Sequence, residues 1–306
     1  MPLYLGIDGG QSSTIALIGD ESGRVIGEGR AGPCNHVGAS ERRAKFLSAV
    51  GDSVNQAAAQ AVVKPVFAAC CAGFSGGFAD KDALTRELIR ANRYLITHDA
   101  HIALSGATAG GPGIVAIAGT GSIAYGRNDS GLTARAGGWG YVYGDEGSAF
   151  DLVRQAVRML LREQEGWGAQ ASRSARGSSH LRDGLLNATA CPNAHALLHR
   201  FYTDEYPRER VAALAPLIDQ AAAMGDPAAL ELLSSAAQSL ATFAIAVRRN
   251  LFPDTASVNV HHIGGVFHSD CVLTRFRMLL ELDGETRVLA PQHGPAHGAL
   301  LEAYKL

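Results

Sequence analysis

The feature that most constrains this fold is an internal repeat of three short strands. The first copy covers residues 3–28 and reads strand, glycine-rich loop, strand, turn, strand. The second copy starts with "GIVAIA" at residues 113–118 and continues through "GTGS", "IAYG", the turn "RNDSGL" and "TARAGG". Ser22-Gly23 in the first turn corresponds to Ser130-Gly131 in the second. We expect two duplicated half-molecules, although glycine-rich hairpins also recur by chance.

Helices and strands alternate around the two copies. Helical spacing of apolar residues predicts a helix over residues 40–61, and a shorter helix is expected over residues 82–91. "VKPVFAACCAG" and "RYLITHDA" read as strands, and the second of them ends at Asp99. Strands that alternate with helices predict an α/β architecture with mostly parallel pairing.

The second half predicts more helix than the first. One helix follows "GDEGS", and another covers about residues 210–224. A third starts at Pro227, behind the N-cap candidate Asp226, and breaks near Asn250 before the strand "SVNVHHIGG". The polar stretch over residues 166–191 is assigned neither an element nor a role.

Length and charge set the class of protein. The 306 residues predict two domains, over residues 1–112 and 113–306, with a last helix over about residues 296–306 that packs back on the N-terminal domain. The 27 basic and 29 acidic side chains leave a net charge of −2, which favours neither nucleic acid nor an anionic membrane as partner. The chain shows no apolar run of about 18 residues and no basic leader, so we expect a soluble cytoplasmic protein.

The cysteines indicate a reducing environment. They are odd in number, scattered and without a C-x-x-C pair, at Cys34, Cys70, Cys71, Cys191 and Cys271. Neither a disulfide framework nor a zinc site is expected from this pattern.

Two glycine loops offer backbone N–H groups and hydroxyls to a phosphate. "DGGQSST", with Gly9 and Gly10, and "AGTGS", with Gly121, each follow a predicted strand, and together they could hold a polyphosphate from both sides. Each alone is more often a plain hairpin. A third motif, "HHIGGVFHS", has Gly264-Gly265, where a flat ring could approach the backbone, or where the chain simply makes a tight turn into a helix.

Two carboxylates follow predicted strands. Asp8 stands at the mouth of the first glycine loop, where it would repel a phosphate. Asp99 would project from the carboxyl end of a strand, where open α/β sheets bind their ligands. It could accept the proton of an attacking hydroxyl, or cap the helix that starts near Ala100, or both.

A segment rich in glycine and aromatic residues, "AGGWGYVYGDEGSAF", covers residues 136–150. Five glycines around Trp139 predict a backbone-lined pocket beside an apolar wall, which suits a polyol. The alternative is that Trp139 lies in the core and that Asp145 or Ser148 caps the following helix. In "GPCNHVG", Asn35 or His36 could reach a ligand, or Asn35 could simply form a turn.

The order of these motifs resembles that of the N-acetylglucosamine kinase family. It runs from the first glycine loop through "CNHV", "LITHDA", "AGTGS", "GGWGYVYGDEGS" and "IGGVFHS" to "GPAHGALLEAY". That family is a branch of the BadF/BadG/BcrA/BcrD ATPase group in the sugar kinase, Hsp70 and actin superfamily. The resemblance covers nearly the whole chain and implies a duplicated ribonuclease-H-like (actin-like ATPase) fold, with ATP and sugar in a cleft between two domains.

The resemblance also implies an activity and a set of site residues. The activity is transfer of phosphate from ATP to the 6-hydroxyl of N-acetylglucosamine, with Mg²⁺, and related kinases lead us to expect a homodimer. Asp99 would be the catalytic base, and Asp8 would face Mg²⁺. The implied sugar contacts are Asn35, Asp99, Ser122, Gly138, Trp139, Gly140 and Asp145. The implied ATP contacts are Gly9, Gly10, Ser12, Thr120, Gly121, Gly264, Gly265 and Ser269.

Other functions stay open at this stage. Ile123 stands where some family members have Asn, so the strictness of acetamido recognition is open, and glucosamine is the leading alternative substrate. An ATP-driven electron-transfer activator would need cysteine ligands for an iron–sulfur cluster, and Cys70-Cys71 lie in a predicted strand. A sugar-responsive repressor would carry a helix-turn-helix before the first strand, which already starts at Leu3. A non-enzymatic actin-like module would leave "GGWGYVYGDEGS" unexplained.

Overall fold

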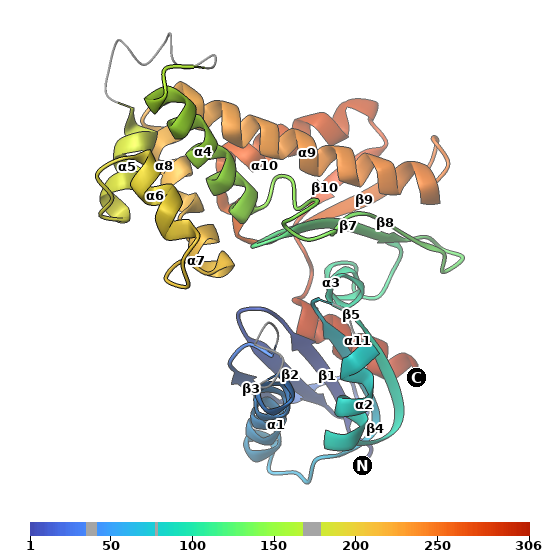
Figure 1. The fold of residues 1–306 in the computed structure, drawn as a ribbon. Helices are drawn as coiled ribbons and strands as arrows, with labels where there is room; N and C mark the ends of the chain where they lie inside the picture. The colour runs from blue at the N-terminus through green and yellow to red at the C-terminus, as the bar shows by residue number, and fades with distance from the viewer. Residues whose placement is uncertain (35–41, 77–78, 168–178) are drawn as a thin grey trace. The chain divides into compact units, whose positions relative to one another are not determined.

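The computed structural model describes residues 1–34, 42–76, 79–167 and 179–306. The chain divides into two compact units (Figure 1). Unit 1 consists of residues 1–115, 127–132 and 290–306. Unit 2 consists of residues 116–126 and 133–289.

Unit 1 is built on a five-stranded sheet. Its strands are β1 (Tyr4–Gly9), β2 (Thr14–Gly19), β3 (Val25–Ala31), β4 (Val66–Phe74) and β5 (Arg90–His98). They lie in the order β3-β2-β1-β4-β5. The first three strands form an antiparallel meander, and β4 and β5 then run parallel to β1. In register, Gly9, Phe74 and His98 lie side by side, so β1, β4 and β5 end at one edge.

The second sheet repeats this order. Its strands are β6 (Gly113–Ala118), β7 (Ser122–Arg127), β8 (Thr133–Gly137), β9 (Val258–Ile263) and β10 (Thr286–Leu289). They lie in the order β10-β9-β6-β7-β8, so each strand has the same neighbours as its counterpart in the first sheet. The predicted duplicated α/β architecture is confirmed.

The turns after β2 and β7 are built in the same way. Asp20 Oδ1 accepts hydrogen bonds from the Ser22 backbone N–H, at 2.9 Å, and from the Ser22 hydroxyl, at 2.5 Å. Asn128 Oδ1 accepts the same two bonds from Ser130, at 3.1 and 2.8 Å. In each turn the following glycine has φ near +84°, at +85° and +83°. Such side-chain turns form locally, which is why both copies could be read from the sequence.

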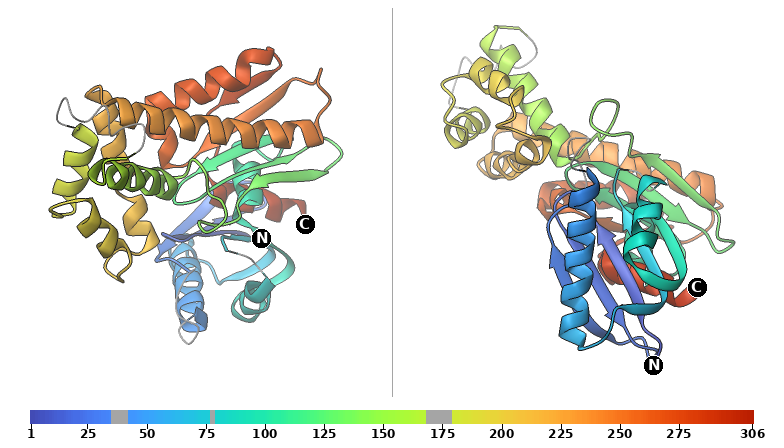
Figure 2. Two further views of the ribbon diagram at one scale, coloured as in Figure 1. Left: turned by 45° about the horizontal axis from the view of Figure 1, so that its top comes forward. Right: turned by 60° about the horizontal axis from the view of Figure 1, so that its bottom comes forward.

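Helices cover both faces of the first sheet (Figures 1 and 2). These are α1 (Arg42–Ala61), α2 (Ala79–Leu88), α3 (Asp99–Ala107) and α11 (Pro295–Lys305). Successive strand residues face opposite sides, so Cys70 packs in the cluster that holds Phe46 and Val50 of α1, whereas Cys71 packs with Ile102 of α3 and Ala299 of α11.

The two helices α3 and α11 pack with close backbones. A Cβ on Gly298 would lie 1.9 Å from the Ile102 carbonyl oxygen, and a Cβ on Gly106 would lie 2.4 Å from the Gly294 carbonyl oxygen. Only glycine fits at such a distance, so these two positions hold the C-terminal helix against α3.

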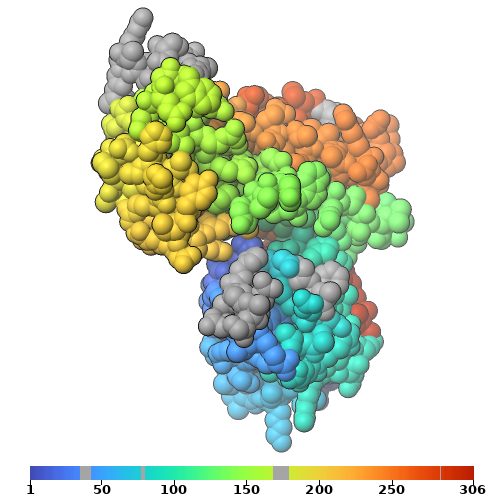
Figure 3. Space-filling model, in the orientation of Figure 1, coloured from blue at the N-terminus to red at the C-terminus, as the bar shows by residue number. Residues whose placement is uncertain are grey.

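Unit 2 carries seven α-helices in its described part, and α4 to α8 gather at one end of it (Figure 1). The space-filling view shows the surface that these residues form, in green and yellow (Figure 3). The helices are α4 (Ala149–Gln164), α5 (His180–Ala188), α6 (Ala194–Phe201), α7 (Arg208–Ala212), α8 (Ala215–Ala223), α9 (Pro227–Leu251) and α10 (Asp270–Leu280). Two short 3₁₀ turns, η2 (Gly265–His268) and η3 (Glu281–Asp283), flank α10. The predicted start of α9 is confirmed, because the Asp226 side chain accepts from the Ala228 and Ala229 N–H groups.

Two expectations about helices were wrong in detail, and one stretch without a predicted element contains a helix. The helix expected over residues 210–224 is two helices, α7 and α8, because Pro216 has no backbone N–H with which to continue the first. The helix expected over residues 82–91 lies earlier, and β5 already begins at Arg90. The polar stretch that received no element contains α5, whose N-cap is Ser179.

The long helix α9 is apolar enough to cross a membrane by length and composition alone. Its Leu233, Leu240 and Val247 are at most 2% exposed within unit 2. The core helix of a globular protein passes the same test, so this helix is weak evidence for a membrane protein.

Candidate active site

The carboxyl edge of the first sheet gathers the unit 1 residues predicted for the site. Asp8 lies one residue before the end of β1, and Asp99 follows the last residue of β5. Ser75 follows β4 and donates its backbone N–H to the Gly9 carbonyl, at 3.2 Å. Because the parallel strands end in register, Asp8, Ser75 and Asp99 share one edge.

Asp8 carries a carboxyl group that has no hydrogen-bond partner in the described part of the chain. Among the residues that the structure describes, no hydrogen bond or ion pair reaches its oxygens, and burial followed by the nearby charge of Asp99 raises its pKa to about 7. A cation would relieve both effects. The described residues hold no cluster of three or more metal-ligating side chains. One carboxylate with phosphates and water suits Mg²⁺, which keeps much of its hydration.

Asp99 is the first residue of α3 rather than its N-cap. The cap is His98, whose Nδ1 accepts from the His101 N–H at 3.2 Å, so the expectation that Asp99 caps this helix is wrong. Asp99 Oδ1 accepts from the Ala100 N–H, at 2.8 Å. Burial raises the pKa of Asp99, against the opposing effects of the Ala100 N–H and the Lys81 charge. A carboxyl with a raised pKa is a better proton acceptor than an ordinary one.

Lys81, whose charge acts on Asp99, escaped the sequence analysis. Lys81 on α2 donates to the Ser75 carbonyl, at 2.5 Å, and its ammonium lies 5.6 Å from the centre of the Phe74 ring. Burial lowers the pKa of Lys81, while the charges of Cys34 and Asp99 oppose that shift. The motif "GFSG", which contains Ser75 and follows a predicted strand, resembles the other glycine loops. It could have indicated that this segment belongs to the site.

The first glycine loop is a tight turn in which the Gly10 N–H donates to the Ser13 carbonyl, at 2.9 Å. A Cβ on Gly9 would lie 2.3 Å from the Phe74 ring and 2.8 Å from Cys34 Sγ, so glycine is required there. Ser12 is exposed at the tip of the loop. Asn35 and His36 lie outside the described residues.

In unit 2, the second glycine loop is bonded to the "GDEGS" segment. Asp145 Oδ1 accepts from the Ser122 N–H, at 3.2 Å, and the Ser122 hydroxyl donates to the Glu146 carbonyl, at 2.7 Å. The Ser122 carbonyl accepts from the Gly138 N–H, at 3.0 Å. A Cβ on Gly121 would lie 3.0 Å from both Asp145 oxygens. Four predicted site residues therefore meet here.

Asp145 is buried and has φ of +64°, which few residues other than glycine adopt. Burial raises its pKa, while the Ser122 N–H and the Arg208 charge oppose that shift. Strained backbone of this kind persists where the surroundings fix it and is concentrated at functional sites. The helix cap is Ser148, which accepts from the Asp151 N–H at 3.1 Å, so Asp145 is not needed as a cap.

The segment between Gly138 and Gly144 exposes its aromatic side chains. Trp139 is 65% exposed and Tyr143 is 81% exposed, so the alternative that Trp139 lies in the core is wrong. Gly138 and Gly140 have φ of +73° and +81°. A glycine-rich loop that presents bare rings to solvent suits the apolar face of a sugar ring.

The third motif makes a tight turn and also lines a cavity. Gly264 has φ of +111°, and a Cβ there would lie 2.3 Å from the Ala118 carbonyl oxygen, beside the second glycine loop. Ser269 caps α10 and donates its hydroxyl to Asp219. Gly265 and Ser269 line a cavity of about 360 Å³, together with small apolar residues such as Ala149, Ala213, Pro216 and Val266. That lining would accept a flat ring.

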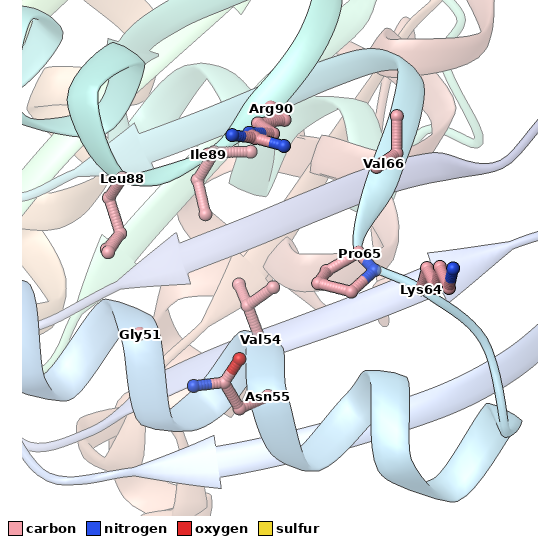
Figure 4. A pocket seen from close by; sticks show the side chains of 9 residues that line it. All are labelled: Gly51, Val54, Asn55, Lys64, Pro65, Val66, Leu88, Ile89 and Arg90. Atoms are coloured by element: carbon pink, nitrogen blue, oxygen red, sulfur yellow. The ribbon is translucent and has the colours of Figure 1, made fainter.

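Another hollow, of about 390 Å³, lies in unit 1 (Figure 4). It is lined by α1 residues such as Val54 and by Val66 and Arg90, the first residues of β4 and β5. These residues stand at the opposite ends of the strands from Ser75 and Asp99, and none was predicted for the site.

Comparisons with known proteins identify the family and the fold. A profile of the BadF/BadG/BcrA/BcrD ATPase family matches residues 5–303. The chain is 28% identical to an N-acetylmuramic acid/N-acetylglucosamine kinase from Clostridium acetobutylicum, over 99% of this chain and 98% of that one. It is 27% identical to a glucosamine kinase from Vibrio cholerae, over 100% and 97% of the two chains. A solved structure of a candidate N-acetylglucosamine kinase from Chromobacterium violaceum has a TM-score of 0.78 at 26% identity, over 98% of each chain.

Proposed function

This chain belongs to the BadF/BadG/BcrA/BcrD ATPase family, and on that premise we propose that it is an ATP-dependent kinase that phosphorylates the 6-hydroxyl of N-acetylglucosamine. The observation that carries the proposal is the pair Asp8 and Asp99 at the carboxyl edge of one sheet. Burial raises the pKa of both carboxyl groups, and within the described part of the chain no hydrogen bond or ion pair reaches the Asp8 oxygens. A metal-bound phosphate and a sugar hydroxyl are the groups that these two side chains would serve.

In the proposed reaction, Asp99 accepts the proton of the 6-hydroxyl. The sugar oxygen forms a bond to the γ-phosphorus of ATP, and the bond from that phosphorus to the β,γ-bridging oxygen breaks, so ADP leaves with the electron pair. Such transfer asks the protein for positioning and charge neutralisation more than for covalent chemistry. Asp8 would hold Mg²⁺, which supplies positive charge to the phosphates.

On the sugar side, the proposal assigns Ser122, Gly138, Trp139, Gly140 and Asp145. The Asp145 carboxylate is buried and prepared to accept hydrogen bonds from sugar hydroxyls, and the exposed rings beside it would cover an apolar face. Asn35 is proposed for the same role from the family resemblance.

On the nucleotide side, the proposal assigns the two glycine loops and the cavity behind Gly264. Backbone N–H groups of the loops would bind phosphates, and the cavity lined by Gly265 and Ser269 would hold the adenine. The assigned residues are Gly9, Gly10, Ser12, Thr120, Gly121, Gly264, Gly265 and Ser269.

Glucosamine is the second candidate substrate, and the Vibrio cholerae relative supports it. One feature favours the acetylated sugar instead. Ile123 packs so closely on Gly138 that a Cβ there would lie 2.6 Å from its side chain, so the wall beside the proposed sugar residues is apolar. An acetamido methyl group suits such a wall better than an ammonium does.

The electron-transfer alternative needs cysteines that can share a cluster. Cys70 and Cys71 are both fully buried and pack on opposite faces of the sheet, so they cannot present two thiolates to one cluster. This geometry favours the kinase.

The remaining parts of the proposal are organisational. We propose that residues 1–112 and 113–306 form the two domains, with the last helix, over about residues 296–306, packed back on the N-terminal domain. We also propose that the enzyme works in the cytoplasm and forms a homodimer. Light scattering on the purified protein measures the mass of the assembly directly.

A sugar panel tests the function. ADP release is measured with ATP, Mg²⁺ and N-acetylglucosamine, glucosamine, glucose or N-acetylmuramic acid. We expect the highest kcat/KM with N-acetylglucosamine and no product from its 6-deoxy analogue. The proposal fails if no sugar in the panel releases ADP, and the choice of substrate changes if glucosamine gives the highest kcat/KM.

The matched control is Asp99→Asn, which keeps the shape of the side chain and removes the base. General-base catalysis is worth about 10²- to 10⁴-fold, so kcat should fall by at least about a hundredfold. Near-normal turnover by the folded variant would remove Asp99 from the mechanism.

A further inference from the structure

Arg208 connects the proposed sugar residues to the proposed nucleotide residues within unit 2. It is the first residue of α7, and its side chain is 17% exposed. Its Nη2 donates to Asp145 Oδ2 and to the Thr120 carbonyl, the latter at 3.3 Å. Asp145 is one of the proposed sugar residues and Thr120 one of the proposed nucleotide residues, so one guanidinium donates hydrogen bonds to a residue of each set.

Aromatic rings fix the orientation of this guanidinium. Its central carbon lies 5.2 Å from the centre of the Tyr141 ring and 5.8 Å from that of Phe150. Arginine commonly stacks on rings in this way, because the planar cation is weakly hydrated. The side chain is therefore held by two rings, a carboxylate and a carbonyl.

The guanidinium nevertheless keeps an unused donor. Arg208 Nε is buried and has no acceptor among the described residues. Arginine and carboxylate usually meet through two parallel hydrogen bonds, whereas here only Nη2 reaches Asp145. A buried donor without an acceptor is rare in folded proteins. One explanation is that a ligand accepts its hydrogen bond during function.

We propose that Arg208 is a catalytic residue whose guanidinium binds the γ-phosphoryl group of ATP during transfer, an assignment that rests on the proposed kinase function. The phosphoryl group carries spread negative charge while its bond to the bridging oxygen breaks and its bond to the sugar oxygen forms. Arginine takes no proton and forms no covalent bond in this step. It supplies donors and positive charge at the group that moves.

The simpler role for Arg208 is to hold Asp145 for the sugar. That role predicts a loss of sugar affinity and no preference among nucleotides, because Asp145 is assigned to the sugar alone. Contact with the γ-phosphoryl group predicts instead a loss that depends on the third phosphate. The two roles therefore separate in a binding experiment that contains no sugar.

The test compares a non-hydrolysable ATP analogue with ADP, each with Mg²⁺, by titration calorimetry. We expect Arg208→Met to weaken binding of the analogue at least tenfold and binding of ADP less than twofold. Arg208→Lys keeps the charge without the planar fork and should show a smaller difference of the same sign. Equal weakening of both nucleotides, or weakening of neither, would overturn the proposal.

Turnover supplies the second readout. Removal of one preorganised donor to a transition state typically costs about 10²- to 10³-fold in kcat, so Arg208→Met should lose that much while the sugar KM stays within about threefold. A raised sugar KM with unchanged kcat would assign Arg208 to positioning Asp145 and would overturn the proposal. If Arg208→Met does not fold, Arg208→Lys decides between the outcomes by the same two measurements.

The matched control is Arg210→Ala on the same helix. Arg210 is exposed, donates to the Glu205 carbonyl at 2.8 Å and lies 4.7 Å from the Tyr206 ring. Its removal should leave both nucleotide affinities unchanged. Nucleotide binding does not require the sugar to be known, so failure of the sugar panel and failure of this proposal are separate results.

Discussion

Glu302 on α11 is a buried carboxylate that accepts hydrogen bonds from three side chains of unit 1, and its replacement by glutamine should destabilise that unit strongly. Oε1 accepts from the Ser105 hydroxyl at 2.5 Å, from Arg127 Nη1 at 3.1 Å and from Lys305 Nζ at 2.9 Å. Oε2 lies 3.8 Å from His101 Nε2. The side chain is 7% exposed and that of Arg127 is 15% exposed, so the network is mostly removed from water.

The expected magnitude follows from what Glu302→Gln leaves behind. An amide cannot balance the charge of Arg127, and its NH₂ group would face other donors. Breaking a buried ion pair on one side typically costs about 3 to 5 kcal/mol, because the remaining charge stays buried. Total stabilities of domains are about 5 to 15 kcal/mol, so this change would remove about a fifth or more of the total.

The same network sets a pH dependence. Burial alone would raise the pKa of Glu302, but hydrogen bonds from His101, Ser105 and Lys305, with the Lys305 charge, outweigh it and hold the pKa well below its usual range. The unfolded value is about 4.3, so the ionised network stabilises the folded protein above about pH 4.3. This contribution is lost as the pH falls towards the lower folded pKa.

The assay is urea unfolding of the wild type and Glu302→Gln at about pH 7, 5 and 3.5, with hydrogen exchange of α3 and α11 to localise the loss. The difference in unfolding free energy should be largest at pH 7 and should shrink below about pH 4.3. Glu21→Gln, at an exposed position in the same unit, is the control and should change stability by less than about 0.5 kcal/mol. A loss below about 1 kcal/mol at pH 7, or one independent of pH, would refute the reasoning.

Three further changes have defined outcomes. Asp8→Ala should lower Mg²⁺-dependent turnover by about a hundredfold or more while sugar binding stays nearly constant, because it removes the side chain proposed to hold the Mg²⁺ that neutralises the phosphates. Equal losses in turnover and in sugar binding would make Asp8 structural. Val62→Gly should stabilise the protein by about 0.5 to 1 kcal/mol, because Val62 directly follows the last residue of α1 with φ of +55°, where glycine relieves backbone strain. A lower urea midpoint than that of the wild type would contradict this. Gly264→Ala should abolish soluble folding or nucleotide binding, because a Cβ there meets the Ala118 carbonyl oxygen at 2.3 Å; normal behaviour in both assays would contradict it.

The parts of the fold that the sequence predicted well are those that depend on local chemistry. The Asp20 and Asn128 turns form within five residues, and Asp226 caps α9 with its own neighbours. The repeat then follows from two such hairpins, and the family profile confirms the resemblance.

The parts that the sequence did not predict depend on distant partners. Arg208 pairs with Asp145 from 63 positions away, in a stretch without a recognisable motif. Lys81 lies on α2, which begins three residues earlier than the helix expected over residues 82–91. The predicted site residues themselves stay predictions, to be tested by the variants above.

The cysteines also make the native chain a convenient reporter. Four of the five are buried, and Cys271 alone is exposed, on the first turn of α10. Its neighbour Ser269 lines the cavity proposed for the adenine. A thiol-reactive fluorophore should therefore attach at one position without any substitution, two residues from that cavity. Its emission could then follow nucleotide binding in real time, in the wild type and in each variant alike.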